Sequence, residues 1–143
     1  MAMKDVDRIR MVHHRTRAKA FFDAMRLVSD DLPSYGEAVA LLAVHSAISL
    51  SDAVVVAMIG ARSNAQDHVA ASKPLETLCQ KKRLDRSGIK HLSWLLHRKT
   101  RFAYDDDVVV YAEIKLAAIA ASRFRAWVYR TFPEVAYEND SSS

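Results

Sequence analysis

The chain has 143 residues, of which 50% are hydrophobic and 27% charged, so it suits one compact soluble domain. Three glycines, three prolines and 8% aromatic residues are too few for a sheet sandwich or a barrel, and the apolar content excludes a disordered chain. The single cysteine, Cys79, excludes a disulfide framework and favours a reducing compartment, so we expect a cytoplasmic protein.

The apolar spacing predicts five helices in an all-α, up-and-down bundle of four or five helices. The first helix spans about residues 4–29. Its expected inward stripe is Phe21, Met25 and Val28. Ser34 and Glu37 have the spacing of a capping box, which predicts the start of a second helix. That helix is expected to end at Gly60, a residue that accepts a left-handed cap.

A third helix is predicted over about residues 63–82, where Pro74 should kink or divide it. A fourth helix spans about residues 87–100, and the acidic residues 105–107 suit the positive end of a fifth. The fifth helix is expected to end near Phe132. The apolar residues expected inside are Val69, Leu75 and Leu78, then Ile89, Leu92 and Leu96, and finally Val109, Ala112, Leu116, Ala120, Phe124 and Trp127.

These elements leave no linker, so we expect one helical domain over residues 1–133 and a disordered tail over residues 134–143. The second helix is apolar on nearly every face, which places it at the centre of the bundle or against a second subunit. We therefore expect a homodimer. Residues 38–59 are long enough to cross a membrane, but His45 and Asp52 inside them favour a buried core helix without membrane contact.

A polar stripe interrupts this apolar helix. His45, Ser49 and Asp52 share one face, because they are offset by four and seven residues. Polar groups in such a helix must be hydrogen-bonded internally or must line a cleft. Two interpretations therefore stay open: a polar network within the core, or an aspartate that orients His45 as a general base.

Basic residues gather between Lys81 and Arg101, with Asp85 as the only acid. They are Lys81, Lys82, Arg83, Arg86, Lys90, Arg98, Lys99 and Arg101. This surplus can attract a polyanion such as RNA, and it is equally typical of a solvated face with ordinary salt bridges. No metal-ligand spacing and no glycine-rich phosphate loop occurs, so we expect no metal and no cofactor. Cys79 is expected to be a buried thiol.

The segment after Gly60 brings together an arginine and a histidine around a helix break. Arg62 lies in the expected turn and His68 in the first turns of the next helix, which frees Arg62 to approach His68. An arginine that binds phosphate and a histidine that moves a proton are sufficient to cut RNA without a metal. Ser63 and Asn64 would add the free amides of a helix start to this anion pocket. The structural alternative is a surface arginine and a packing histidine.

A resemblance to the HEPN domains (higher eukaryotes and prokaryotes nucleotide-binding) covers about residues 34–132. It rests on the order LLAVHSAISLSDAVVVAMIGARSNAQDHVAASKPL, then LLHRKTRFAY, then an apolar helix ending in RFRAWVYRTF. The resemblance implies a bundle of four or five helices that usually dimerises. Many members are metal-independent endoribonucleases that carry an arginine, four to six residues and then a histidine, a pattern that Arg62 and His68 match.

The resemblance extends to the basic loop before the last helix. Lys99, Arg101 and Tyr104 stand where members commonly have a basic residue followed by tyrosine, which implies a substrate-binding role. The structural alternative for Tyr104 is to brace the fourth helix against the fifth. The formula of an arginine followed by a histidine also fits Arg8 with His13 or His14, and Arg86 with His91. The position after Gly60 distinguishes Arg62 from these other matches.

Two hypotheses follow. The first is an RNA-directed protein, specifically a metal-independent endoribonuclease of toxin or defence type, with Arg62 and His68 as the catalytic pair. The alternative is a non-catalytic HEPN interaction module that binds a nucleotidyltransferase partner or a nucleotide. Ser63 and Ala70 depart from the toxin pattern and favour the alternative. The partners expected are a second copy, RNA, and an antitoxin or a nucleotidyltransferase.

Overall fold

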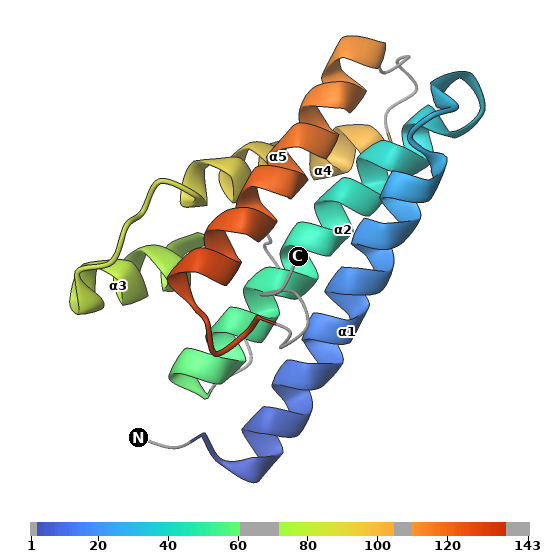
Figure 1. Cartoon of the computed structure of the whole chain (residues 1–143). Helices are drawn as coiled ribbons and strands as arrows, with labels where there is room; N and C mark the ends of the chain where they lie inside the picture. The colour runs from blue at the N-terminus through green and yellow to red at the C-terminus, as the bar shows by residue number, and fades with distance from the viewer. Residues whose placement is uncertain (1–2, 61–71, 105–109, 137–143) are drawn as a thin grey trace.

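The computed structural model describes residues 3–60, 72–104 and 110–136, and every regular element in these ranges is a helix. The helices are α1 (Asp5–Val28), α2 (Leu32–Ile59), α3 (Ser72–Lys82), α4 (Ile89–Tyr104) and α5 (Tyr111–Thr131). Figure 1 shows α1 and α2 as a long antiparallel pair, with α5 running along the other side of α2. The predicted all-α architecture is confirmed for the described part of the chain.

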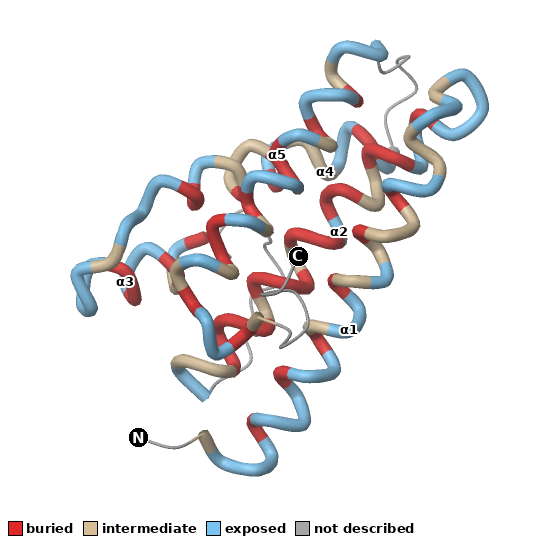
Figure 2. Tube along the Cα trace, viewed as in Figure 1, coloured by how far each residue is buried: buried red, intermediate tan, exposed pale blue. Residues whose placement is uncertain are grey.

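The central helix is α2, which packs against each of the four other helices. Fourteen of its 28 residues are buried, and Figure 2 shows buried positions along most of its length. Length and composition alone would let this helix cross a membrane, yet 72% of its most apolar window is buried inside the bundle. The other helices of the same chain therefore bury most of the apolar surface of α2, and a second subunit is not needed to explain why this helix is so apolar.

The buried face of α1 differs from the predicted one, because Phe22 is buried in place of Phe21. Phe22 and Met25 are buried, whereas Phe21 and Val28 are only half-buried. The buried residues of the helix are Asp7, Met11, His14, Ala18, Phe22 and Met25. They are separated by three or four residues throughout, so the stripe keeps the helical period over the whole helix. The prediction considered only its last two turns.

The predicted capping box of Ser34 and Glu37 does not begin α2, because the N-cap residue is Asp31. The helix begins at Leu32, and the Asp31 carboxylate accepts a hydrogen bond from the Ser34 amide at 3.2 Å. Pro33 does not prevent this earlier start, because the first amides of a helix have no partner within it. At the other end Gly60 adopts the predicted left-handed cap, with φ of 77° and its N–H bonded to the carbonyls of Val55 and Val56.

The burial pattern of α5 agrees with the prediction only in its second half. Ala120, Phe124 and Trp127 are buried as predicted, but Ala112 and Leu116 are exposed. The residues buried instead in the first half are Ile114 and Ala117. Steps of four residues overshoot a helical turn by about 40°, so the predicted stripe drifted off the core toward the start of the helix. Val109 lies outside the described residues.

The predicted core positions in α3 and α4 are confirmed, except that Val69 lies outside the described residues. Leu75 and Leu78 are buried in α3, as are Ile89, Leu92 and Leu96 in α4. Pro74 lies in the first turn of α3 as described, where a missing amide is tolerated. The packed chain continues beyond residue 133, because Val135 is fully buried and its carbonyl accepts a bond from Arg15 Nη1 at 3.4 Å. Residues 134–136 were predicted to belong to the tail but pack with the domain, and residues 137–143 lie outside the described residues.

The corrected start of α2 is testable by removing each candidate cap. We expect Asp31→Ala to lower the free energy of unfolding by about 1 kcal/mol, because it deletes the N-cap acceptor. Ser34→Ala should cost clearly less, since the serine contributes its backbone N–H rather than its hydroxyl to the cap. Urea unfolding followed by circular dichroism measures both. A larger loss for Ser34→Ala would restore the capping box and contradict the structure.

A second prediction concerns the contact of Gly88 with the Trp127 indole. A Cβ at residue 88 would lie 2.1 Å from Trp127 Cγ, and Trp127 is fully buried with its Nε1 donating to the Asp85 carbonyl at 3.1 Å. Gly88→Ala should therefore lower the free energy of unfolding by about 1–3 kcal/mol. The matched control is Gly36→Ala, whose Cβ meets only the tip of the Ile114 side chain at 2.8 Å.

Gly36 lies inside α2, so alanine there also gains helix propensity of about 1 kcal/mol. We expect the free energy of unfolding of Gly36→Ala to lie within about 1 kcal/mol of the wild-type value. Equal stabilities for the two alanine variants would show that the indole does not press against residue 88.

Candidate functional site

The predicted catalytic pair, Arg62 and His68, lies in residues 61–71, outside the described residues, together with Ser63 and Asn64. The structure does describe the point from which this segment starts. The left-handed conformation of Gly60 ends α2 two residues before Arg62. The segment therefore departs from a defined place, at the end of the central helix and beside the first turns of α1.

A buried carboxylate lies at this point of departure. Asp7 belongs to the first turn of α1, is 8% exposed, and its Oδ2 lies 3.1 Å from where a Cβ of Gly60 would stand. A buried carboxyl group in such a place favours a cationic or hydrogen-bond-donating neighbour. Sequence reasoning missed Asp7, although it occupies the inward stripe four residues before Met11.

The polar stripe of α2 runs from the interior to the surface. Ser49 is buried, Asp52 is half-buried, and His45 is exposed with its ring centre 5.8 Å from that of Phe21 in α1. An exposed imidazole packed against a phenyl ring is not part of the core. Of the two interpretations of the stripe, a network wholly within the core therefore does not include His45.

The basic run divides into two parts with different surroundings. Lys81, Lys82, Arg83, Arg86 and Lys90 are exposed, from the end of α3 to the first turn of α4. In this part Asp85 accepts bonds from the Ser87 amide and hydroxyl at 2.9 and 2.8 Å, which lower the pKa of its carboxyl. The turn between α3 and α4 therefore carries a surplus of positive charge around one carboxylate.

The second part of the run is tied to α5 by a carboxylate. Arg101 Nη2 lies 3.1 Å from Glu113 Oε2, and Arg98 Nε lies 3.7 Å from Glu113 Oε1. The interpretation of ordinary salt bridges therefore holds for Arg98 and Arg101. Lys99 is half-buried, and Tyr104 is the last residue of α4, with a side chain outside the described set.

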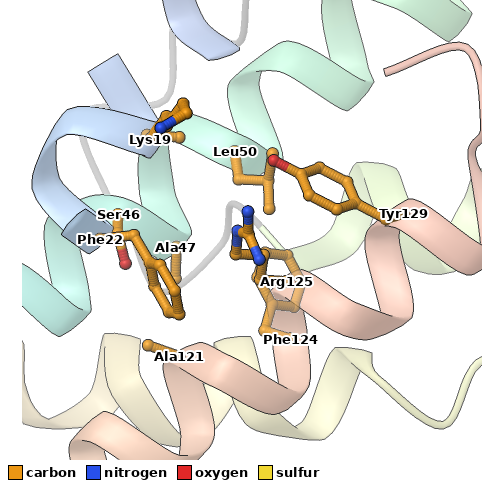
Figure 3. A pocket seen from close by; sticks show the side chains of 10 residues that line it. Lys19, Phe22, Ser46, Ala47, Leu50, Ala121, Phe124, Arg125 and Tyr129 are labelled. Carbon is orange, nitrogen blue, oxygen red and sulfur yellow. The ribbon is translucent and has the colours of Figure 1, made fainter. Parts of the chain in front are cut away.

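A small cavity lies between α1, α2 and α5, and Figure 3 shows Arg125 pointing into it. The Arg125 guanidinium carbon is 4.8 Å from the ring centre of Phe22 and 4.7 Å from that of Tyr129, so two cation–π contacts hold it. The free volume is about 10 Å³, enough for roughly one water molecule. This cavity is a feature of the packing and too small for a nucleotide.

Two larger hollows open on the surface on either side of α5. One, between α4 and α5, has a volume of about 250 Å³ and is lined by Lys90, His91 and Trp94 on its α4 side. The other, between the end of α1 and α5, has a volume of about 780 Å³ and includes Arg26. Ile119 and Arg123 of α5 border both hollows. Either is large enough for side chains or a base, and sequence reasoning identified neither.

Other reactive groups have ordinary roles. Cys79 is fully buried as predicted, and burial raises the pKa of its thiol, so the sulfur stays protonated and packs as a small apolar group. Within residues 3–60, 72–104 and 110–136, no group of three histidine, cysteine or acidic residues is arranged to hold a metal ion. Of the other matches to the arginine–histidine formula, Arg8 and His13 point about 140° apart on α1, and His14 is buried.

Comparison with known protein families, with curated proteins and with solved structures gives no match. The function of the chain therefore has to be argued from its own residues. The resemblance to HEPN domains stays a prediction drawn from the sequence.

The groove between α4 and α5 yields a prediction about His91. Burial, together with the charges of Lys90 and Arg123, lowers the pKa of His91 below its ordinary value of about 6.5. The unfolded chain therefore takes up this proton at a higher pH than the folded chain. The stability contribution of His91 is thus intact above about pH 6.5 and is lost as the pH falls through the folded-state pKa.

The ring resonances of His91, followed by NMR, should titrate with a midpoint below about 6.5. Arg123→Gln should raise that midpoint, because it removes a positive charge that opposes protonation. Lys81→Gln, an equal charge change on α3, is the control and should leave the midpoint in place. If the titration midpoint of His91 is the same in wild type and in Arg123→Gln, the charge of Arg123 does not act on His91, and the prediction is wrong.

Proposed function

We propose that this chain is an RNA-directed protein of the HEPN type that cuts RNA without a metal, with Arg62 and His68 as its catalytic pair. The observation that carries the proposal is the left-handed Gly60 cap, which ends the central helix two residues before Arg62. The buried Asp7 carboxylate beside Gly60 supports it, because a carboxylate there suits a cationic residue in the chain that follows.

The proposed reaction needs one base, one acid and one cation. His68 takes the proton of a ribose 2′-hydroxyl, and the resulting oxygen attacks the neighbouring phosphorus. The 5′-oxygen of the next nucleotide leaves and takes up a proton, so that the products are a 2′,3′-cyclic phosphate and a 5′-hydroxyl. Arg62 binds the phosphate and stabilises the charge that develops on its oxygens. In a homodimer, two such pairs facing one cleft would supply the acid and the base from different copies.

The exposed cations from Lys81 to Lys90 support binding of the RNA backbone. They lie on the surface of α3, of the turn that follows and of the first turn of α4, with Asp85 as the one acid among them. Such a surplus attracts phosphates at long range and raises the rate of encounter at low salt. The proposal accordingly assigns recognition to this basic surface and chemistry to the segment after Gly60.

The test is RNA cleavage by the purified full chain with EDTA present. We expect fragments with 5′-hydroxyl ends, and we expect His68→Ala and Arg62→Ala each to lower the cleavage rate by about 10²–10⁴-fold. The matched controls are His97→Ala, an exposed histidine on α4, and His91→Ala, which belongs to the rival pair Arg86 and His91. Both controls should cut at the wild-type rate.

Cleavage that persists in His68→Ala but disappears in His91→Ala would move the catalytic site to the rival pair Arg86 and His91, at the start of α4. Cleavage that persists in every variant would point to a contaminating nuclease and contradict the proposal. A folded wild-type chain that leaves RNA intact would favour the non-catalytic interaction module.

A further inference from the structure

The groove between α4 and α5 is a surface feature that neither the core nor the proposed catalytic pair uses. It is an open hollow of about 250 Å³ at the middle of α5. Its main lining residues are Lys90, His91, Trp94, Leu116, Ile119 and Arg123. The two helices that form it are packed directly on α2 and on each other, so the groove is held by the rigid part of the bundle.

The α5 side of the groove is aliphatic and exposed. Leu116 is 52% exposed and Ile119 is 42% exposed, although both are large apolar residues. They lie three residues apart and therefore form neighbouring anchors on one face of the helix. Their exposure leaves apolar area in contact with water, and covering it with another apolar surface is favourable by about 25 cal/mol per Å². This part of the groove suits apolar side chains.

The rest of the lining is positively charged. Lys90 on α4 and Arg123 on α5 are both exposed, and no acidic residue lines the groove. Both charges reach the half-buried His91 and help to lower its pKa, which indicates that their fields converge inside the groove. The complementary surface is therefore apolar at its centre and negatively charged at its edges.

We propose that this groove binds an acidic amphipathic helix of a protein partner. Apolar residues spaced three and four apart on the partner helix would rest on Leu116 and Ile119. Glutamate or aspartate residues flanking that stripe would pair with Lys90 and Arg123. The inference does not depend on the proposed catalytic pair, because it uses neither Arg62 nor His68, and Lys90 is the one residue that it shares with the proposed RNA-binding surface.

A second copy of this chain and an RNA strand fit the groove less well. A two-fold contact between copies places the same patch on both sides, so Lys90 and Arg123 would face a patch with the same two charges. RNA bases bind through stacking on aromatic rings, and the groove offers two aliphatic residues and one indole. The Arg98 guanidinium already covers one face of Trp94, at 3.8 Å from the ring centre, and Glu113 holds that guanidinium.

The test uses a dye-labelled synthetic helical peptide of about 18 residues, with leucines at heptad spacing and glutamates on both flanks of the leucine stripe. Fluorescence anisotropy of this peptide, titrated with the full chain, should show saturable binding that weakens as salt is added. A peptide of the same composition with the leucines spread around the helix should bind at least about tenfold more weakly.

Variants of the chain assign the peptide to the groove. Ile119→Asp and the charge reversals Lys90→Glu and Arg123→Glu should each weaken binding at least about tenfold. The matched controls are Ile9→Asp, at a 70% exposed position on α1, and Lys81→Glu, on the exposed side of α3. Both controls should bind the peptide as the wild type does, and circular dichroism should show the same helix content in every variant.

Three outcomes would overturn the proposal. The first is a failure of the binding assay: no peptide binds, the two peptides bind equally well, or Ile119→Asp binds the peptide as tightly as the wild type does. The second is displacement of the peptide by single-stranded RNA whose own binding is lost in Trp94→Ala, which would make the groove an RNA site. The third is a change from dimer to monomer in Ile119→Asp, seen by sedimentation, which would make it an interface between copies. Unchanged RNA cleavage by Ile119→Asp would keep this inference separate from the proposed function.

Discussion

Burial of α2 by the four other helices is the constraint on which the rest of the structure depends. The valines at its centre, such as Val44 and Val54, are fully buried, and each stabilises the fold by about 1.5–3 kcal/mol relative to an exposed valine. The alanines between them, Ala47 and Ala53, are buried as well. Asp31 and Gly60 define the two ends of α2, so the described chain reaches a defined position at Gly60, directly before residues 61–71.

The sequence predicts the features that depend on local chemistry. Five helices and the inward face of α4 follow from the helical period, and the end of α2 follows from a glycine that accepts a left-handed conformation. The start of α2 does not follow, since Asp31 and Ser34 are both good caps and residue preference alone does not select between them. The burial of Val135 depends on a contact with α1 that no local pattern contains.

The candidate sites were predictable to different degrees. The position of Arg62 after a helix end could be read from the sequence, and its approach to His68 stays a prediction because both residues lie outside the described ranges. The substrate contact of Arg101 stays a prediction, and its salt bridge with Glu113 of the next helix is a feature that only the packing of α4 on α5 reveals. The same packing exposes Leu116, which periodicity had assigned to the core. The structure thus separates a basic surface around the turn before α4 from an apolar, positively edged groove on α5.

Hydrogen exchange of backbone amides tests the central role of α2 most directly. If the other helices depend on it, the amides of residues 39–56 should be the slowest in the chain to exchange, and they should open only when the whole domain unfolds. The free energy of their exchange should then equal the free energy of unfolding measured in urea. Slower exchange in α5 than in α2, or opening of α2 while α5 stays protected, would contradict the account.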